Sequence, residues 1–178
     1  MIGRLEQGLV QIYTGEGKGK TTAALGQAFR AVGHDLKVFM IMFMKGNREY
    51  GELVSAKRLT PLFEIRQVGR DTFVSKEHPD PIDIRFAQDG LNLAKKIVAA
   101  GSHDLVILDE INVALDFTLI NLADVLELVR TKPSPVELIL TGRNAPRDLI
   151  AIADLVTEMK LVKHPYQRGI GARLGIEH

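Results

Sequence analysis

Short apolar runs alternate with longer amphipathic segments along most of this chain. Four of the runs are rich in Val, Ile, Leu and Met, and they predict buried strands at residues 9–13 (LVQIY), 37–44 (KVFMIMFM), 104–108 (DLVIL) and 136–140 (VELIL). Residues 63–68 (FEIRQV) alternate between apolar and polar side chains with a period of two, which is also typical of a strand.

The segments between these runs have the periodicity of helices. After a glycine-rich turn, one helical face is predicted from Leu25, Ala28, Phe29 and Val32, and Gly33 suits the end of that helix. A longer helix is predicted from Asp83 to about Ala100, with an apolar stripe made of Ile84, Ala87, Leu91, Ala94 and Val98. Shorter helices are predicted over residues 51–59, 121–130 and 147–153, and residues 69–82 are predicted to be a loop.

Strands that alternate with helices favour a mostly parallel sheet covered by helices on both faces. We therefore predict an α/β fold of three layers, a helix layer on each side of the sheet. The chain has no internal repeat or linker-like stretch, and its 178 residues are expected to form one domain, residues 1–178.

Composition narrows the classes of function. The 23 basic and 22 acidic residues are interspersed and give a net charge of +1, which argues against a large nucleic-acid interface. No apolar run approaches the roughly 20 residues of a membrane span, and the opening MIGRLEQG is too polar to predict a signal peptide. The chain has no cysteine, which excludes disulfides, thiolate zinc sites and cysteine nucleophiles, and a cytoplasmic location is expected.

A glycine-rich, cationic stretch joins the first predicted strand to the first predicted helix. In such a setting backbone N–H groups can surround phosphate oxygens, and the helix N-terminus adds positive potential. The motif G-x-x-x-x-G-K-[ST] is matched except that Thr14 replaces its first glycine. The candidate phosphate-binding residues are Gly15, Glu16, Gly17, Lys18, Gly19, Lys20, Thr21 and Thr22. The alternative is a glycine-rich turn with lysines present by chance.

Within this stretch, Lys20 can reach terminal phosphates and the Thr21 hydroxyl can bind Mg²⁺. Asp109 and Glu110 follow a predicted strand, and the carboxyl ends of parallel strands meet at one edge of a sheet. We therefore expect both acids to lie near Thr21, where they could bind Mg²⁺ directly or through water. The alternative is that Asp109 or Asn112 caps a helix that begins at Val113.

Arg143 ends the next predicted strand in the sequence LTGR, at the same edge of the sheet. It could neutralise a phosphate or a leaving group, and with Lys20 it is a candidate catalytic residue. The alternative is a solvated surface arginine.

Several stretches together resemble the P-loop type of ATP:corrinoid adenosyltransferase from the bacterial cobalamin pathway. They are TGEGKGKTTAALG (14–26), RAVGH (30–34), FMKG (43–46), LVILDEINVAL (105–115), ILTGRNAPRDLIAIADLVTEM (139–159) and VKHPYQRGIGARLGIE (162–177). The resemblance covers nearly the whole chain. It implies a P-loop NTPase fold of the RecA-like kind, with ATP and a corrinoid as substrates and Mg²⁺ as a cofactor.

The resemblance also implies the chemistry. Such enzymes transfer the 5′-deoxyadenosyl group of ATP to Co(I) of a corrinoid and release triphosphate, in cobalamin biosynthesis or salvage. By the family pattern, Thr21 and Glu110 contact Mg²⁺, a reductase can supply Co(I), and the enzyme is a homodimer. The reaction needs C5′ placed in line with cobalt and a stabilised leaving group, and it needs no general base.

The family holds the corrinoid with apolar side chains from a loop that matches residues 69–82. Phe73 is the aromatic residue of this loop, so it is the candidate corrinoid contact. The family's second aromatic position falls on Ser75 here. The alternative is that Phe73 anchors the loop in the core.

Two other classes of function compete with the transferase. One is a P-loop ATPase or GTPase, a switch or motor in which Glu110 activates water. The other is a non-catalytic carrier that binds nucleotide or corrinoid. The five histidines have no metal-ligand spacing, and the C-terminal residues 167–178 suit either a lid or a disordered tail.

Overall fold

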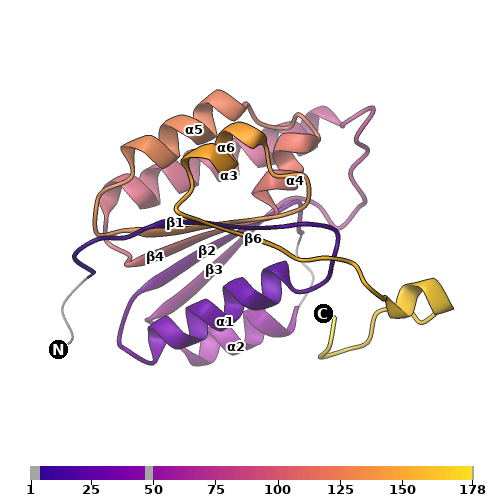
Figure 1. The fold of residues 1–178 in the computed structure, drawn as a ribbon, viewed down its shortest axis with the longest axis horizontal. Helices are drawn as coiled ribbons and strands as arrows, with labels where there is room; N and C mark the ends of the chain where they lie inside the picture. Colours follow the sequence, from indigo (N-terminus) through magenta and orange to yellow (C-terminus); the bar gives the residue numbers. More distant parts are fainter. Residues whose placement is uncertain (1–4, 47–49, 178) are drawn as a thin grey trace.

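The computed structural model describes residues 5–46 and 50–177. Six strands form one sheet in the order β3-β2-β4-β5-β1-β6, and every neighbouring pair is parallel. Helices cover both faces, with α1 and α2 on one side and α3 to α6 on the other (Figure 1). The predicted three-layer α/β fold is therefore confirmed. The strands are β1 (Val10–Thr14), β2 (Val38–Phe43), β3 (Phe63–Val68), β4 (Leu105–Asp109), β5 (Glu137–Thr141) and β6 (Leu155–Glu158).

The middle of the sheet is the core of the molecule. Every residue of β2 and β4 is buried, which explains why these strands are apolar without alternation. At the edge, all four residues of β6 are exposed. The predicted strands lie within one or two residues of the observed ones, and β3 has the predicted bounds.

The helices are α1 (Lys20–Val32), α2 (Gly51–Arg58), α3 (Pro81–Ala100), α4 (Ile111–Asp116), α5 (Leu122–Thr131) and α6 (Arg147–Ile152). A short 3₁₀ turn, η1 (Pro165–Arg168), follows β6.

The inward face of α1 differs from the prediction. Phe29 is 72% exposed, whereas the buried apolar residues of this helix are Ala24, Ala28 and Ala31. Small side chains allow α1 to lie close to the sheet, and the apolar spacing alone does not distinguish this alanine face from the neighbouring one. The prediction was therefore wrong for Phe29, which lies beside the buried face of α1 and not on it.

Helix α3 begins two residues before its predicted start. The Asp80 side chain accepts a hydrogen bond from the backbone N–H of Ile82, and Pro81 occupies the first turn, so the two residues form a helix start. The helix ends at Gly101, which has a left-handed φ of 58°. The stripe of Ala87, Leu91, Ala94 and Val98 is buried as predicted.

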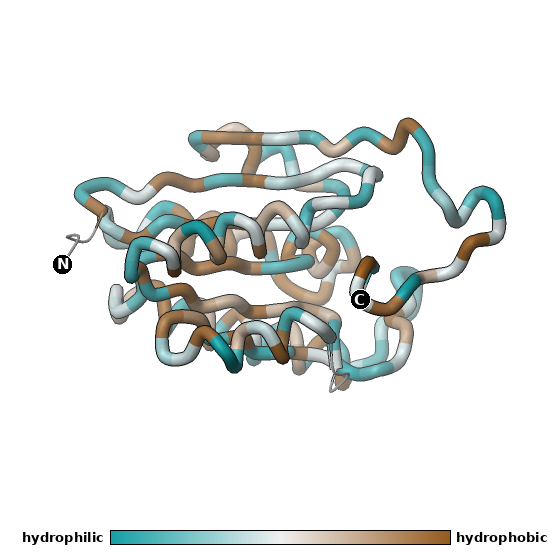
Figure 2. Tube along the Cα trace, turned by 90° about the horizontal axis from the view of Figure 1, so that it is seen from below, coloured by the Kyte–Doolittle hydropathy of each residue, from teal (hydrophilic) through white to brown (hydrophobic). Residues whose placement is uncertain are grey.

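The segment after β6 leaves the edge of the sheet and doubles back, so that the C-terminal end lies near the first turn of α1 (Figures 1 and 2). Glu177 accordingly lines a small hollow together with residues 18–22. The carboxyl ends of β1, β2, β4 and β5, the first turn of α1 and this C-terminal segment therefore meet on one side of the molecule.

Candidate functional site

The glycine-rich loop runs from the end of β1 at Thr14 to the start of α1 at Lys20. Gly15 and Gly19 have φ values of 96° and 123°, which other residues rarely adopt. A Cβ on Gly15 would lie 2.5 Å from the Met159 carbonyl oxygen, and the Gly17 N–H donates to that oxygen at 2.7 Å. The glycines thus allow the backbone after β6 to pack directly on the loop, in addition to leaving N–H groups accessible.

Lys20 lies at the centre of this loop and is 7% exposed. Its Nζ donates to the carbonyl oxygens of Gly15 at 2.7 Å and Gly17 at 2.8 Å. Burial lowers the pKa of Lys20, and the nearby Glu110 only partly offsets this effect. The ammonium is held where the loop would enclose a phosphate.

Asp109, the last residue of β4, is fully buried, and among the described residues three side chains donate hydrogen bonds to it. Its Oδ1 accepts from the hydroxyls of Thr21 at 2.9 Å and Thr141 at 2.6 Å. Its Oδ2 forms an ion pair with Lys45 Nζ at 2.9 Å. The structure therefore brings Thr21 and Asp109 together as predicted, with both carboxylate oxygens engaged by donors of the chain.

Glu110 has a left-handed backbone, with φ of 61°, and its N–H donates to Thr141 Oγ1 at 3.0 Å. Its carboxyl group lines the same hollow as Thr21 and Thr22. Burial, followed by the charge of Asp109, raises the pKa of Glu110. A partly buried carboxyl group beside a second one is suited to receive a cation.

The helix-cap alternative for these acids is wrong. Helix α4 begins at Ile111 rather than Val113, and Glu110 is its N-cap residue without a side-chain hydrogen bond to the helix. The positive φ of Glu110 explains this, because the turn directs its side chain away from the N–H groups of the helix.

Arg143 and Glu16 lie opposite each other at the mouth of the site. The Arg143 Nε is 3.3 Å from Glu16 Oε2, and both side chains are more than half exposed. An ion pair this exposed contributes little to stability. Both residues line the same cavity as Lys20, so Arg143 can turn toward a ligand there.

A cavity of about 800 Å³ lies at this side of the molecule. Its lining includes Glu16, Lys20, Glu110 and Arg143 together with Phe73 and residues of the Phe73 loop. Phe73 is 95% exposed, whereas the adjacent Val74 is 5% exposed and belongs to the core cluster. The core-anchor alternative for Phe73 is therefore wrong, because Val74 anchors the loop and leaves the Phe73 ring free.

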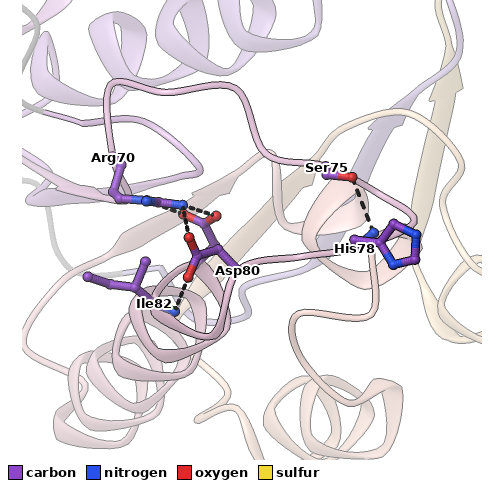
Figure 3. Close-up of polar contacts among 6 residues, drawn as sticks. Arg70, Ser75, His78, Asp80 and Ile82 are labelled. Carbon is purple, nitrogen blue, oxygen red and sulfur yellow. Dashed lines mark hydrogen bonds and ion pairs between the residues drawn. The ribbon is translucent and has the colours of Figure 1, made fainter.

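The base of the Phe73 loop is fastened to the start of α3 (Figure 3). Arg70 donates from Nε and Nη2 to the two oxygens of Asp83, at 2.8 and 2.6 Å, and Arg70 also lies 3.2 Å from Asp80. Inside the loop the His78 N–H donates to Ser75 Oγ at 3.2 Å. A bidentate pair of this kind fixes orientation as well as distance.

On the far side of the loop, Lys76 holds the loop to α4. Its Nζ lies 2.7 Å from Asp116 Oδ2, and Asn144 donates to the same oxygen at 3.0 Å. These contacts lower the pKa of Asp116. The loop is thereby tied at both ends, with Phe73 between the ties.

A second hollow, of about 470 Å³, lies between the glycine loop and the C-terminal segment. It is lined by Gly17, Lys18, Lys20 and Arg143 on one side and by Leu161, His164, Tyr166 and Gln167 on the other. The His164 side chain accepts from the Tyr166 N–H, which shapes the 3₁₀ turn. The segment after β6 therefore lies beside the glycine loop, and whether residues 167–178 act as a lid stays a prediction.

Three residues at the site carry no motif of their own and were missed from the sequence. Lys45, Thr141 and Arg70 lie at or just after the ends of β2, β5 and β3, and each contacts an acid between 13 and 64 residues away in the chain. Lys45 lies within the FMKG stretch and Thr141 within LTGR, so the position of each at the carboxyl end of a strand was the available signal. Burial alone would lower the pKa of Lys45, but Asp109 and Glu110 outweigh it and the pKa is raised.

Among residues 5–46 and 50–177, no three His, Cys, Asp or Glu residues are grouped so that they alone could hold a metal ion. The oxygen donors gathered here are instead the Thr21 hydroxyl and the carboxylates of Asp109 and Glu110, which suit Mg²⁺ completed by phosphate oxygens and water. In the same part of the chain, none of the helices has the length and apolar character that crossing a membrane requires.

Comparison with known proteins agrees with this geometry. A sequence model of the family described as ATP:corrinoid adenosyltransferase BtuR/CobO/CobP matches residues 6–178. A corrinoid adenosyltransferase of a Sinorhizobium species is 37% identical over 174 residues, which is 97% of this chain and 81% of the relative. The corrinoid adenosyltransferase of Escherichia coli K12 is 34% identical over 173 residues, covering 97% of this chain and 87% of the relative.

A solved structure extends the comparison to the fold. The KaiC-like protein PH0186 of Pyrococcus horikoshii superimposes with a TM-score of 0.58 at 17% sequence identity, over 90% of this chain and 76% of that protein. At this identity the likeness concerns the fold alone, and it agrees with the predicted RecA-like arrangement.

Proposed function

We propose that this chain, which belongs to the ATP:corrinoid adenosyltransferase family, transfers the 5′-deoxyadenosyl group of ATP to Co(I) of a corrinoid and releases triphosphate. The electron pair of Co(I) forms the Co–C5′ bond while the C5′–O5′ bond breaks. The electrons of the broken bond leave on the triphosphate. The residues of this chain then have two tasks, to place C5′ before the cobalt and to stabilise the departing charge.

The observation that carries this proposal is that one cavity joins a phosphate-binding loop to an exposed aromatic residue. Lys20, Glu110 and Arg143 line the 800 Å³ cavity, and Phe73 lines the same cavity. A switch or motor that hydrolyses the γ-phosphate has no need of an exposed ring opposite its loop. An enzyme that brings an apolar macrocycle to a nucleotide does, because the ring can pack on the macrocycle while the loop holds the phosphates.

Lys20 is proposed to stabilise the leaving triphosphate. Its buried ammonium would trade the carbonyls of Gly15 and Gly17 for phosphate oxygens, with backbone N–H groups of residues 15–22 beside it. Arg143, on the exposed side of the cavity, can leave Glu16 and add a second positive charge.

Mg²⁺ is proposed to bind between Thr21 and Glu110. The Thr21 hydroxyl and the Glu110 carboxyl line the same hollow, and both are hard oxygen donors. Asp109 is proposed to act through Thr21 rather than by direct contact, because its oxygens accept from Thr21, Thr141 and Lys45. When bound, the ion would neutralise charge on the triphosphate.

The deciding experiment supplies ATP, Mg²⁺ and a chemically reduced corrinoid. We expect a light-sensitive Co–C product and triphosphate in equal amounts. ADP and orthophosphate formed without corrinoid would instead identify a hydrolase, and tight binding without turnover would identify a carrier. Omitting Mg²⁺ tests the metal in the same assay.

Residues 1–178 are proposed to act as one domain and to form a homodimer. The edge strand β6 supports the dimer, because Leu155 and Val156 are 42% and 40% exposed there and a second copy could cover them. Sedimentation of the purified protein tests the subunit number.

A separate reductase is proposed to supply Co(I), since no described residue offers a redox-active thiol. A cytoplasmic location stays a prediction.

A further inference from the structure

Among residues 5–46 and 50–177, Lys45 is the one cation that forms an ion pair with Asp109. Its Nζ lies 2.9 Å from Asp109 Oδ2, and the Asp109 side chain is fully buried. Lys45 comes from the residues that follow β2, which lies beside β4 in the sheet with Met42 paired to Asp109. It also lines the 800 Å³ cavity, so its ammonium stands between this cavity and the buried carboxylate.

The backbone around Lys45 is shaped to hold it there. Met44 has a φ of 56°, a left-handed value that a non-glycine residue adopts only under constraint from its surroundings. A Cβ on Gly69 would lie 2.7 Å from the backbone nitrogen of Lys45, so the turn after β3 packs directly on the backbone of this residue. On the other side, Lys45 Nζ lies 5.4 Å from the centre of the Tyr50 ring. The position of the ammonium is therefore built in rather than incidental.

The charges around the metal-binding candidates can be assigned from these contacts. Asp109 and Glu110 are adjacent carboxylates, and Lys45 compensates the first of them. The buried Lys20 ammonium is engaged by two backbone carbonyls. Without nucleotide, a divalent cation that enters the site therefore meets Glu110 as the carboxylate that forms no direct ion pair with a described residue, although Lys45, Lys20 and Arg143 lie close enough to lower its pKa. A Mg²⁺ site with so few charged ligands from the protein relies on phosphate oxygens to complete it.

We propose that Lys45 makes divalent-cation binding depend on the nucleotide. By occupying the approach to Asp109 Oδ2, its ammonium keeps the cation from binding the acidic pair alone, so that the cation enters together with the triphosphate. Lys45 is thus a positioning residue that acts through Asp109. This inference rests on the proposed function only in taking a divalent cation as part of the site.

The test uses nucleotide-free protein and Mn²⁺ as the probe, with neither ATP nor corrinoid present. Wild-type protein should bind Mn²⁺ weakly by calorimetry and electron paramagnetic resonance. Lys45→Met should bind it at least roughly tenfold more tightly, because removing the cation leaves two uncompensated carboxylates close together. Mn²⁺ should also raise the Tm of this variant more than that of the wild type.

Three variants serve as controls. Lys45→Arg keeps the charge and should resemble the wild type, and Lys96→Met removes an exposed lysine of α3 and should do the same. The double variant Lys45→Met/Asp109→Asn should lose the added affinity, since the carboxylate exposed by the first change is gone.

Two results would overturn the inference. One is Mn²⁺ affinity of Lys45→Met equal to that of the wild type. The other is tight Mn²⁺ binding by nucleotide-free wild-type protein, a measurement that stands even if Lys45→Met does not fold. Neither measurement involves adenosyl transfer. The inference can therefore fail while the proposed function holds, and the proposed function can fail while the inference holds.

Discussion

Lys18 and Lys20 lie two residues apart in the same loop but have different surroundings. Lys18 is exposed, whereas Lys20 is buried and hydrogen-bonded to the carbonyls of Gly15 and Gly17. A charge held in a buried, preorganised position stabilises a leaving group more than a solvated one does. We expect Lys20→Met to lower kcat by about 10²–10³-fold and Lys18→Met to lower it much less, as measured from the rate of Co–C bond formation. Equal losses would contradict the role of Lys20.

Glu110 illustrates a residue whose function opposes stability. Burial and the adjacent Asp109 raise the pKa of Glu110, so its ionised form is unfavourable in the folded protein. We expect Glu110→Gln to stabilise the ligand-free protein by about 1 kcal/mol, or about 2–4 °C in Tm for a chain of this size. Thermal unfolding in the presence of EDTA measures this effect.

The same substitution should remove the stabilisation that Mg²⁺ and ATP together give the wild type. Glu127→Gln, at an exposed position of α5, is the matched control and should change neither value. A Glu110→Gln protein that is less stable than the wild type without ligands would show that Glu110 has a structural role instead.

At the scale of single residues, the sequence predicts those members of the site that belong to a contiguous motif. The loop residues 15–22 could be proposed as a phosphate-binding loop because the motif that suggests it is contiguous in the sequence. Lys45 and Thr141 could not, because their roles arise from contacts with Asp109 across 64 and 32 residues of sequence. Such contacts depend on which strands become neighbours, and no local pattern encodes that.

The loop between β3 and α3 behaves as an element of its own, tied by Arg70 at one end and Lys76 at the other. Because Arg70 orients the start of this loop through Asp83, we expect Arg70→Gln to weaken corrinoid binding by roughly tenfold while ATP affinity stays unchanged. Fluorescence or calorimetric titration with each substrate separates the two effects. The exposed Arg85, which pairs with Asp89 on α3, provides the control variant Arg85→Gln. Equal losses for both substrates would contradict a role confined to the loop.

A separate pH-sensitive contact lies at the amino-terminal ends of the strands, away from the candidate site. His103, before β4, packs edge-on against Phe39 with ring centres 5.2 Å apart. Burial lowers the pKa of His103 from its ordinary 6.5, and Glu64 at 3.8 Å only partly offsets this. Between the two pKa values the unfolded chain binds a proton that the folded chain does not, so stability falls as the pH falls below 6.5.

We expect His103→Phe to lose this component of the pH dependence while it keeps an aromatic contact with Phe39. The measurement is the urea midpoint of wild type and variant at several pH values from 8 to 5, where their difference should change in favour of the variant as the pH falls. The exposed His34, changed to Phe, is the control. A constant difference across this range would contradict the assignment.

At the scale of elements, the pattern of apolar residues predicted strands better than helix faces. A strand of a parallel sheet is buried on both sides, so β2 and β4 stand out as uninterrupted apolar runs. The face of α1 was misjudged because its contact with the sheet uses Ala24, Ala28 and Ala31, whose small side chains carry a weak apolar signal. The exposed Phe29 has a larger apolar side chain and therefore gave a stronger apolar signal in the sequence.

At the scale of the whole molecule, the order of the strands decides what the site contains. The order β3-β2-β4-β5-β1-β6 places β4 and β5 beside each other and β1 beside β5, so that Asp109, Thr141 and the glycine loop converge. The same order places β2 next to β4 and brings Lys45 to Asp109. The α/β class was predictable from alternation, but this order, and with it the composition of the cavity, follows from packing across the entire sheet.

The C-terminal segment, residues 161–177, contributes to the site without contributing to the core. Within the described part of the chain, the core clusters and the apolar residues packed on them extend no further than Ala153. Yet Tyr166 and Gln167 line the hollow beside the glycine loop, and Glu177 lines the one beside Thr21. A segment with this placement should be dispensable for folding and needed for binding.

We therefore expect a chain ending at Lys160 to fold, because Met159 still supports Gly17 through its carbonyl and the sheet is intact. Its Tm should change by only a few degrees, which corresponds to about 1 kcal/mol for a chain of this size. Its affinity for ATP should fall roughly tenfold, because the truncation removes one wall of the site. Circular dichroism and calorimetric titration measure the two effects, and Tyr166→Ala in the full chain should reproduce part of the second. A large fall in Tm would make the segment part of the folding unit. Unchanged ATP affinity would instead leave the glycine loop and the sheet edge as the whole nucleotide site.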